Sequence, residues 1–193
     1  FRCLSRYHTV KKLFLMLIAA LSLGFLTASM SAFAAKVSTH IALISQINGP
    51  SYANDLAIKQ HLEALGYAVQ ILDQLQDPKQ IKQVDAIILS STVGSKNLKA
   101  GWRQLEIPLM TWESDYIDDS AMTGKRSGQD FGEVDKARYL WLVNAPHRLS
   151  ANLPAGTLNV YKKQTMMNWG KPGLGATIIA TVYGEPEKAA IWG

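Results

Sequence analysis

Four carboxylates lie close together at the point where an apolar run ends. Glu113, Asp115, Asp118 and Asp119 all fall within the stretch PLMTWESDYIDD, which begins at Pro108. A carboxylate buried beside other carboxylates has a raised pKa and can act as a general acid or base. It can also accept hydrogen bonds from hydroxyl groups or, with its neighbours, bind Ca²⁺ or Mg²⁺. The spacing does not match an EF-hand loop, so we expect neither a metal site nor a cofactor.

The elements that would position these residues alternate between strands and helices. Apolar runs predict strands at 40–45, 67–72, 85–91 and 107–112. Helical patterns lie between them at 51–65 and 95–104, with a short turn around 78–83. This order predicts an α/β fold with a doubly wound, mostly parallel sheet of flavodoxin-like type.

The second half of the chain is rich in β segments. After Asp119, apolar segments separated by Gly and Pro turns lie at 139–143, 157–162, 177–183 and 189–192. We expect these segments to extend the parallel sheet. The last of them is cut at Gly193, which suggests that the chain continues beyond this residue.

Ligands of open parallel sheets bind outside the carboxyl ends of the strands. Glu113 is the candidate catalytic residue at one such end. The candidate ligand-binding residues are Gln46, Asn48, Ser91, Thr92, Gly94, Trp112, Ser114, Asp115 and Tyr116. In this interpretation Gly94 offers its backbone N–H to an anion, and the rings of Trp112 and Tyr116 stack on a sugar. The plainer alternative is that the Ser and Thr residues cap helices, and that Asp118 and Asp119 lie on a solvated loop.

Other kinds of site have little support. His40, His61 and His147 are too scattered to suggest a metal site, and no nucleophile is paired with a histidine as a hydrolase triad requires. The chain contains no G-x-G-x-x-G, P-loop or H-E-x-x-H motif.

The amino-terminal segment has the pattern of an export signal. Lys11 and Lys12 precede an apolar run from Leu13 to Leu26, and Ala32-Phe33-Ala34 offers a small-x-small cleavage pattern. The run is shorter than the roughly 20 residues of a membrane span. We therefore expect a signal peptide at 1–34, a periplasmic or secreted domain at 35–193, and no membrane span after cleavage. Because Val can initiate translation in bacteria, we hypothesise that translation starts at Val10 and that residues 1–9 are not translated.

Removing this segment changes the charge and the chemistry of the chain. The net charge of +5 rests on four basic residues before residue 35, and without them sixteen basic residues face fifteen acidic ones. A near-neutral domain has no electrostatic footprint for nucleic acid, so we expect no such partner. The single cysteine, Cys3, also lies in this segment, and the expected mature domain therefore has no thiol nucleophile or disulfide.

Two stretches resemble class I glutamine amidotransferase-like domains. "DAIILSSTVGS" and "IPLMTWESDY" are similar to the strands that carry the oxyanion loop and the G-x-C-x-G nucleophile elbow, and "LVNAPHRLSANLPAG" looks like a loop of the trehalose-utilisation (ThuA-like) type. The resemblance covers about residues 40–193. It implies the same fold and an exported member without the catalytic cysteine, because Glu113 stands at the cysteine position and Thr111 and Asp115 at the elbow glycines.

The catalytic His-Pro-Glu of that family has no counterpart either, since Glu185-Pro186-Glu187 has no histidine. Glutamine hydrolysis through a thioester is therefore not expected. The sequence predicts an exported bacterial domain that binds a small polar ligand, with carbohydrate as one class, at the carboxyl edge of the sheet. Two alternatives remain open: a sugar-directed hydrolase or isomerase that uses Glu113 as acid/base, and a protein-interaction module of the cell envelope.

Overall fold

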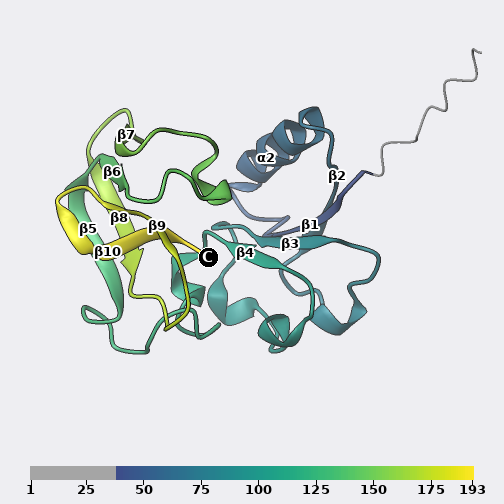
Figure 1. Cartoon of the computed structure of the whole chain (residues 1–193). Helices are drawn as coiled ribbons and strands as arrows, with labels where there is room; N and C mark the ends of the chain where they lie inside the picture. The colour runs from purple at the N-terminus through teal and green to yellow at the C-terminus, as the bar shows by residue number, and fades with distance from the viewer. Residues whose placement is uncertain (1–37) are drawn as a thin grey trace, which may run out of the picture. The chain divides into compact units, whose positions relative to one another are not determined.

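A four-stranded parallel sheet forms the first half of the fold in a computed structural model that describes residues 38–193 (Figure 1). Its strands are β1 (His40–Ser45), β2 (Ala68–Asp73), β3 (Ala86–Leu89) and β4 (Leu109–Thr111), in the order β2-β1-β3-β4. The central strands β1 and β3 are almost entirely apolar and buried, as parallel strands covered on both faces must be. All four strands were predicted, and their spatial order is that of the flavodoxin-like type.

The single α-helix of the described residues is α2 (Tyr52–Ala64), which covers one face of this sheet. Its residues Ile58 and Leu62 pack against a core cluster formed by Ile41, Leu43, Val69 and Ile88. The helix ends before Gly66, whose φ of +95° a glycine adopts without strain. This helix agrees with the prediction for 51–65.

The other face of the sheet is covered without an α-helix. Short 3₁₀ turns lie at η1 (Pro78–Gln80), η2 (Ser95–Asn97) and η3 (Trp102–Gln104). The helix predicted for 95–104 does not form, because Gly101 has a φ of +118° and Trp102 turns its ring into the core. The expected parallel α/β sheet is therefore present, but among the described residues an α-helix covers only one of its faces, so the doubly wound arrangement is not complete.

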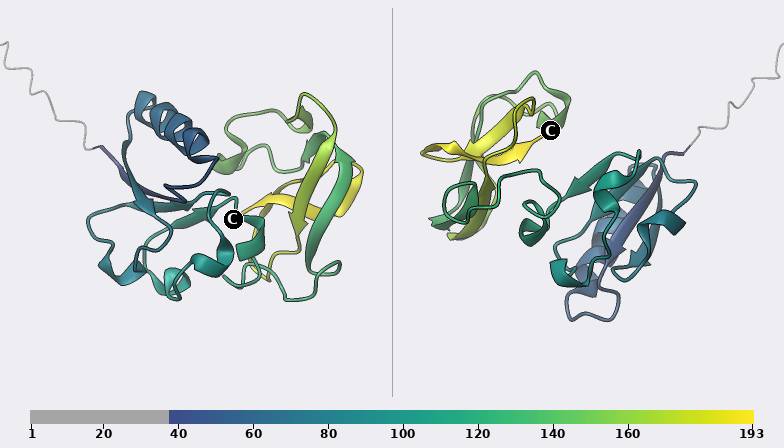
Figure 2. Two further views of the ribbon diagram at one scale, coloured as in Figure 1. Left: turned by 180° about the vertical axis from the view of Figure 1, so that it is seen from behind. Right: turned by 90° about the horizontal axis from the view of Figure 1, so that it is seen from below.

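The second half forms its own six-stranded antiparallel sheet (Figures 1 and 2). Its order is β5-β8-β10-β9-β6-β7. The strands are β5 (Phe131–Ala137), β6 (Tyr139–Leu142), β7 (Gly156–Asn159), β8 (Thr165–Gly170), β9 (Ile178–Val182) and β10 (Glu185–Trp192). The prediction that this half extends the parallel sheet is wrong, and β5 and β8 were not predicted.

The predicted signal peptide, residues 1–34, lies outside the described residues. Across residues 38–193, none of the helices combines the length and the apolar character that crossing a membrane requires.

Candidate functional site

Glu113 lies just past the end of β4 and is held there by its own backbone and by a neighbouring strand. Its N–H donates to Thr111 Oγ1 at 2.9 Å, and that hydroxyl donates in turn to the carbonyl of Leu89 at 3.2 Å. Its carboxylate Oε1 accepts a hydrogen bond from the N–H of Asp115 at 2.9 Å. Through this bond Glu113 caps the amino end of η4 (Ser114–Tyr116). Strand β3 therefore fixes the backbone position of Glu113 through Thr111.

The environment of Glu113 favours a carboxyl group that can exchange a proton. The residue is only 8% exposed, and this burial raises its pKa. The N–H of Asp115 acts in the opposite direction, and the charge of Asp115 raises the pKa slightly further. Within residues 38–193, no hydrogen bond reaches Oε2 and no cation pairs with this carboxylate.

A pocket of about 320 Å³ opens beside Glu113, between the end of β4 and the antiparallel sheet. Four aromatic side chains contribute to its walls: Trp112, Tyr161, Trp169 and Trp192. Its volume lies at the lower end of the range for small-molecule sites, which are typically apolar with a few polar groups. The predicted residues Trp112, Glu113 and Ser114 meet in this pocket.

The antiparallel sheet supplies the part of the pocket that sequence reasoning missed. Leu140 from β6, Met167 and Trp169 from β8, and Trp192 from β10 all line it. These residues follow Glu113 by 27 to 79 positions. The sequence contained one sign of these residues, which is its abundance of tryptophan. Tryptophan residues, however, more often belong to a core than to a binding site.

The carboxyl ends of β1 and β3 are occupied by a buried side chain, Asp55, which the prediction did not include. Asp55 lies in the first turn of α2 and is fully buried. It accepts hydrogen bonds from Ser45 Oγ, from Ser90 Oγ at 2.5 Å and from Thr92 Oγ1 at 2.5 Å. The predicted ligand residue Thr92 is therefore engaged inside the fold. An acid in a first helical turn is common, so its sequence position alone gave no signal.

The remaining candidates near β1 and β3 do not line the pocket beside Glu113. The N–H of Gly94 donates to Gln74 Oε1 at 2.8 Å, so it is not free to bind an anion as expected. The N–H of Gln46 donates to Thr92 Oγ1 at 3.3 Å. Asn48 and Ser91 are exposed.

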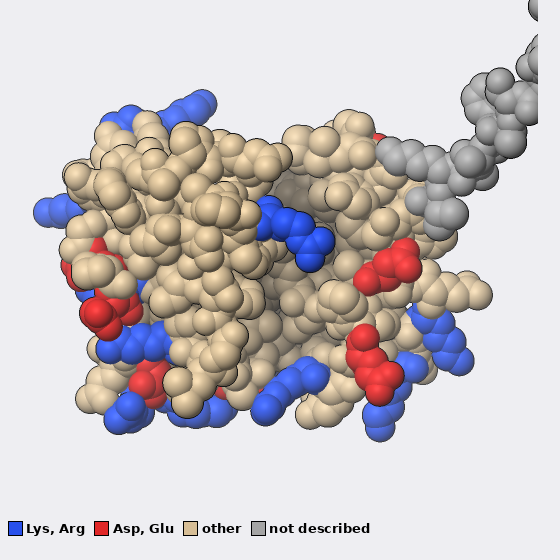
Figure 3. Space-filling view, viewed as in Figure 1, with Lys and Arg blue, Asp and Glu red and all other residues tan. Residues whose placement is uncertain are grey.

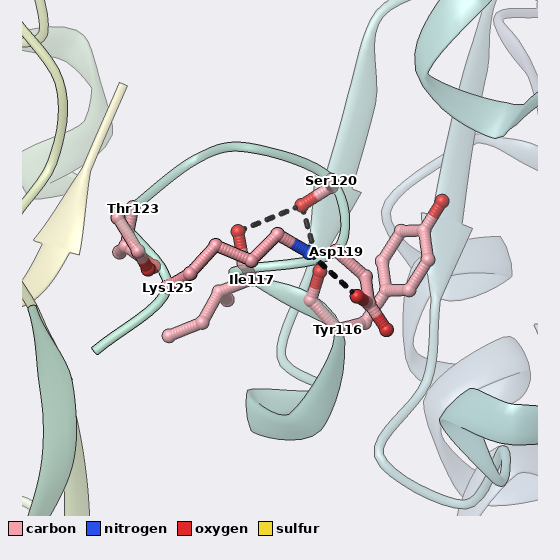
Figure 4. A network of polar contacts seen from close by, with 7 residues as sticks. Tyr116, Ile117, Asp119, Ser120, Thr123 and Lys125 are labelled. Carbon is pink, nitrogen blue, oxygen red and sulfur yellow. Dashed lines mark hydrogen bonds and ion pairs between the residues drawn. The ribbon is translucent and has the colours of Figure 1, made fainter. Parts of the chain in front are cut away.

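The acidic stretch after Glu113 separates into different environments, and Figure 4 shows the contacts of Asp119 and Ser120. Asp115 is exposed, whereas Tyr116 packs in the core with Trp102 and does not line the pocket beside Glu113. Asp119 forms an exposed ion pair with Lys125 at 2.9 Å. Ser120 Oγ donates to the carbonyls of Tyr116 at 2.8 Å and Ile117 at 3.1 Å. The solvated-loop interpretation therefore describes Asp119.

The arrangement of charged side chains bears on two questions: whether a metal site is present and whether a surface patch carries charge of one sign. In the part of the chain that the structure describes, no group of three or more His, Cys, Asp or Glu side chains is arranged to hold a metal ion. On the face shown in Figure 3, basic and acidic side chains of the described residues are interspersed.

Comparison with known proteins identifies the fold. No family model matches the chain, and no curated protein matches it. A solved structure that is similar is that of a protein from Thermoplasma acidophilum, provisionally assigned as one of the subunits of GMP synthase, with a TM-score of 0.54 and 11% identity. The match covers 76% of this chain and 74% of that one. The chain therefore has a glutamine amidotransferase-like α/β fold with a β-rich part.

The geometry around Glu113 differs from a nucleophile elbow. Such an elbow is a strained turn from a strand into a helix. Glu113 has an ordinary extended backbone, with φ −86° and ψ 106°, and a 3₁₀ turn follows it. Glu113 is thus displayed past the end of β4 without the strain that exposes a catalytic nucleophile.

Proposed function

We propose that this protein is an exported domain that binds a small polar ligand in the pocket beside Glu113 and lacks thiol-dependent glutaminase activity. The proposal rests on one observation, which is the exposure and the hydrogen bonding of Glu113 in the pocket wall. Glu113 is 8% exposed, one of its oxygens has no hydrogen-bond partner within residues 38–193, and it lines a pocket of about 320 Å³. Oε2 is therefore available to accept a hydrogen bond from a ligand in this pocket.

Carbohydrate is one ligand class that suits these walls. Aromatic rings can cover the faces of a sugar, and the carboxylate of Glu113 can accept hydrogen bonds from its hydroxyl groups. The resemblance to the trehalose-utilisation type supports the same class. The signal-peptide pattern at residues 1–34 supports a periplasmic or secreted location.

A second candidate is an enzyme that uses Glu113 as general acid or base on a sugar. The raised pKa of Glu113 favours this candidate, because a proton-transfer group works best when its pKa is near the working pH. A third candidate is an envelope interaction module. It is favoured by Trp141 in β6 and Tyr183 in the turn after β9, which are 45% and 53% exposed and have ring centroids 6.1 Å apart.

A thermal-shift screen tests the binding proposal. The protein is melted with a panel of neutral, acidic and amino sugars, both as wild type and as the Glu113→Gln variant. A ligand at about a hundred times its Kd adds roughly 2.7 kcal/mol to the free energy of unfolding. We expect a sugar to raise Tm for the wild type and for Glu106→Gln, a matched exposed control, but not for Glu113→Gln. No shift with any ligand would instead favour the interaction module.

A further inference from the structure

We propose that the ligand of this pocket is a small organic cation, whose ammonium group binds against the Glu113 carboxylate between the tryptophan walls. This inference rests on the proposed function and narrows the class of ligand. An amino sugar would satisfy both proposals, whereas a neutral sugar would satisfy only the first.

The first argument is the charge of the pocket. Among the described residues that line it, Glu113 is the one carboxylate and none is Lys, Arg or His. The nearby charge of Asp115 is also negative. A negatively charged ligand would therefore meet repulsion, with no cation in the lining to offset it.

The second argument is that the partly buried carboxylate of Glu113 has no counter-ion among the described residues. A neutral ligand leaves Glu113 either charged without a counter-ion or protonated, and burial penalises the charged form. A cation supplies the missing counter-ion and stabilises the carboxylate directly. The pocket should therefore bind a cation more tightly than a neutral molecule of the same shape.

The third argument is the aromatic wall. Indole rings attract cations through the negative potential of their faces. Trp169 already accepts one within the protein, because Lys188 Nζ lies 5.6 Å from its ring centroid. That lysine also pairs with Glu185 at 3.1 Å and is not part of the pocket lining. Trp112, next to Glu113 and 38% exposed, offers a further indole to the pocket.

The size of the pocket limits the cation to a compact molecule. A volume of about 320 Å³ accommodates a small molecule and excludes a folded peptide segment. A trimethylammonium head or a single amino-sugar ring is of suitable size.

The test uses two pairs of probes that differ in charge. Choline is compared with 3,3-dimethylbutan-1-ol, which has the same shape and no charge, and D-glucosamine is compared with D-glucose. Binding to the full chain is measured by calorimetry and thermal shift near neutral pH. We expect choline and glucosamine to bind at least tenfold more tightly than their neutral partners. Glu113→Gln should reduce this preference severalfold, leaving only the contribution of the indole rings, while Glu106→Gln preserves it.

The pH dependence gives a second readout. Choline has no titrating group, so its affinity should fall as pH is lowered and Glu113 takes up its proton. Asp115, whose charge acts on Glu113, and Lys188, over the ring of Trp169, are two further charged groups near the site, so Asp115→Asn and Lys188→Met are measured in parallel. A pH profile abolished by Glu113→Gln but kept in those two variants assigns the effect to Glu113.

The outcomes separate the two proposals. Equal binding of glucose and glucosamine, or of both choline-shaped probes, overturns the cation inference and leaves the binding proposal standing. Absence of binding by every probe overturns both. If Glu113→Gln does not fold, two variants of the partly exposed Trp112 test the inference instead. Trp112→Leu should weaken choline binding, and Trp112→Phe should preserve most of it. Unchanged choline binding in Trp112→Leu would also overturn the inference.

Discussion

The carboxylate of Asp55 in α2 accepts a hydrogen bond of 2.5 Å from the hydroxyl of Ser90 at the end of β3, 35 residues further along the chain. The same carboxylate also binds the hydroxyls of Ser45 after β1 and Thr92 after β3. One buried side chain therefore joins the helix to the carboxyl ends of the two central strands.

Asp55→Ala should destabilise the protein strongly. The change leaves three buried or half-buried hydroxyls without their acceptor, and each lost partner costs about 1–3 kcal/mol when its group stays buried. We expect a loss of about 3 kcal/mol or more in the free energy of unfolding, measured by urea denaturation. Asn54→Ala, at the exposed neighbouring position, serves as control and should change stability little. Equal effects of the two changes would contradict the role assigned to Asp55.

The raised pKa of Glu113 should appear in the pH dependence of stability. Between about 4.5, the ordinary pKa, and the higher pKa in the folded protein, the folded state holds a proton that the unfolded state has released. Stability contributed by this group therefore falls as pH rises through that interval. Glu113→Gln removes the effect, so its Tm relative to wild type should increase from pH 4 to pH 8.

The measurement is a series of thermal melts of both proteins across that range. Glu106→Gln is melted in parallel to correct for the loss of one negative charge. A Tm difference that stays constant with pH would show that Glu113 has no raised pKa in the folded state.

Gly170 should be essential to the shape of the pocket wall. A Cβ at this position would lie 2.8 Å from the ring of Trp192 and 2.7 Å from Thr123 Cγ2, closer than packed atoms tolerate. Gly170→Ala should therefore cost about 1–3 kcal/mol through overpacking, and it should weaken ligand binding by displacing Trp192. Gly173→Ala is the matched control, because a Cβ there meets nothing within 4 Å. If both variants melt and bind alike, the close packing of Trp192 on Gly170 is not significant.

The proposed signal peptide makes a prediction about the exported protein. Its amino terminus should be Ala35, and the segment 35–193 should not react with maleimide, because the one cysteine within residues 1–193 is Cys3. Intact-mass and thiol-labelling measurements on the exported fraction check both statements. A labelled precursor would show that residues 1–9 are translated and would rule out a start at Val10.

The strands β1 and β3 and the helix α2 could be predicted because their signals are local. Short continuous apolar runs such as IALI and AIIL are typical of strands buried on both faces, and the segment before Gly66 could be recognised as a helix. Its leucines did not identify the packed face, because Leu56 and Leu65 are exposed. The composition likewise determined that residues 4–193 contain no thiol. Glu113 could be placed at a strand end for the same reason, since β4 was recognisable.

The tertiary structure decided the features that depend on partners distant in sequence. Strand β8, with the sequence TMMNWG, is stabilised by pairing with β5 and β10, and strand propensity is largely set by such neighbours. Gly101 ended a helix that its flanking residues predicted. The burial of Asp55 and the placement of Trp169 and Trp192 beside Glu113 followed from packing between segments far apart in the chain. Local pattern carries no information on such contacts, because they arise only when the sheets are assembled.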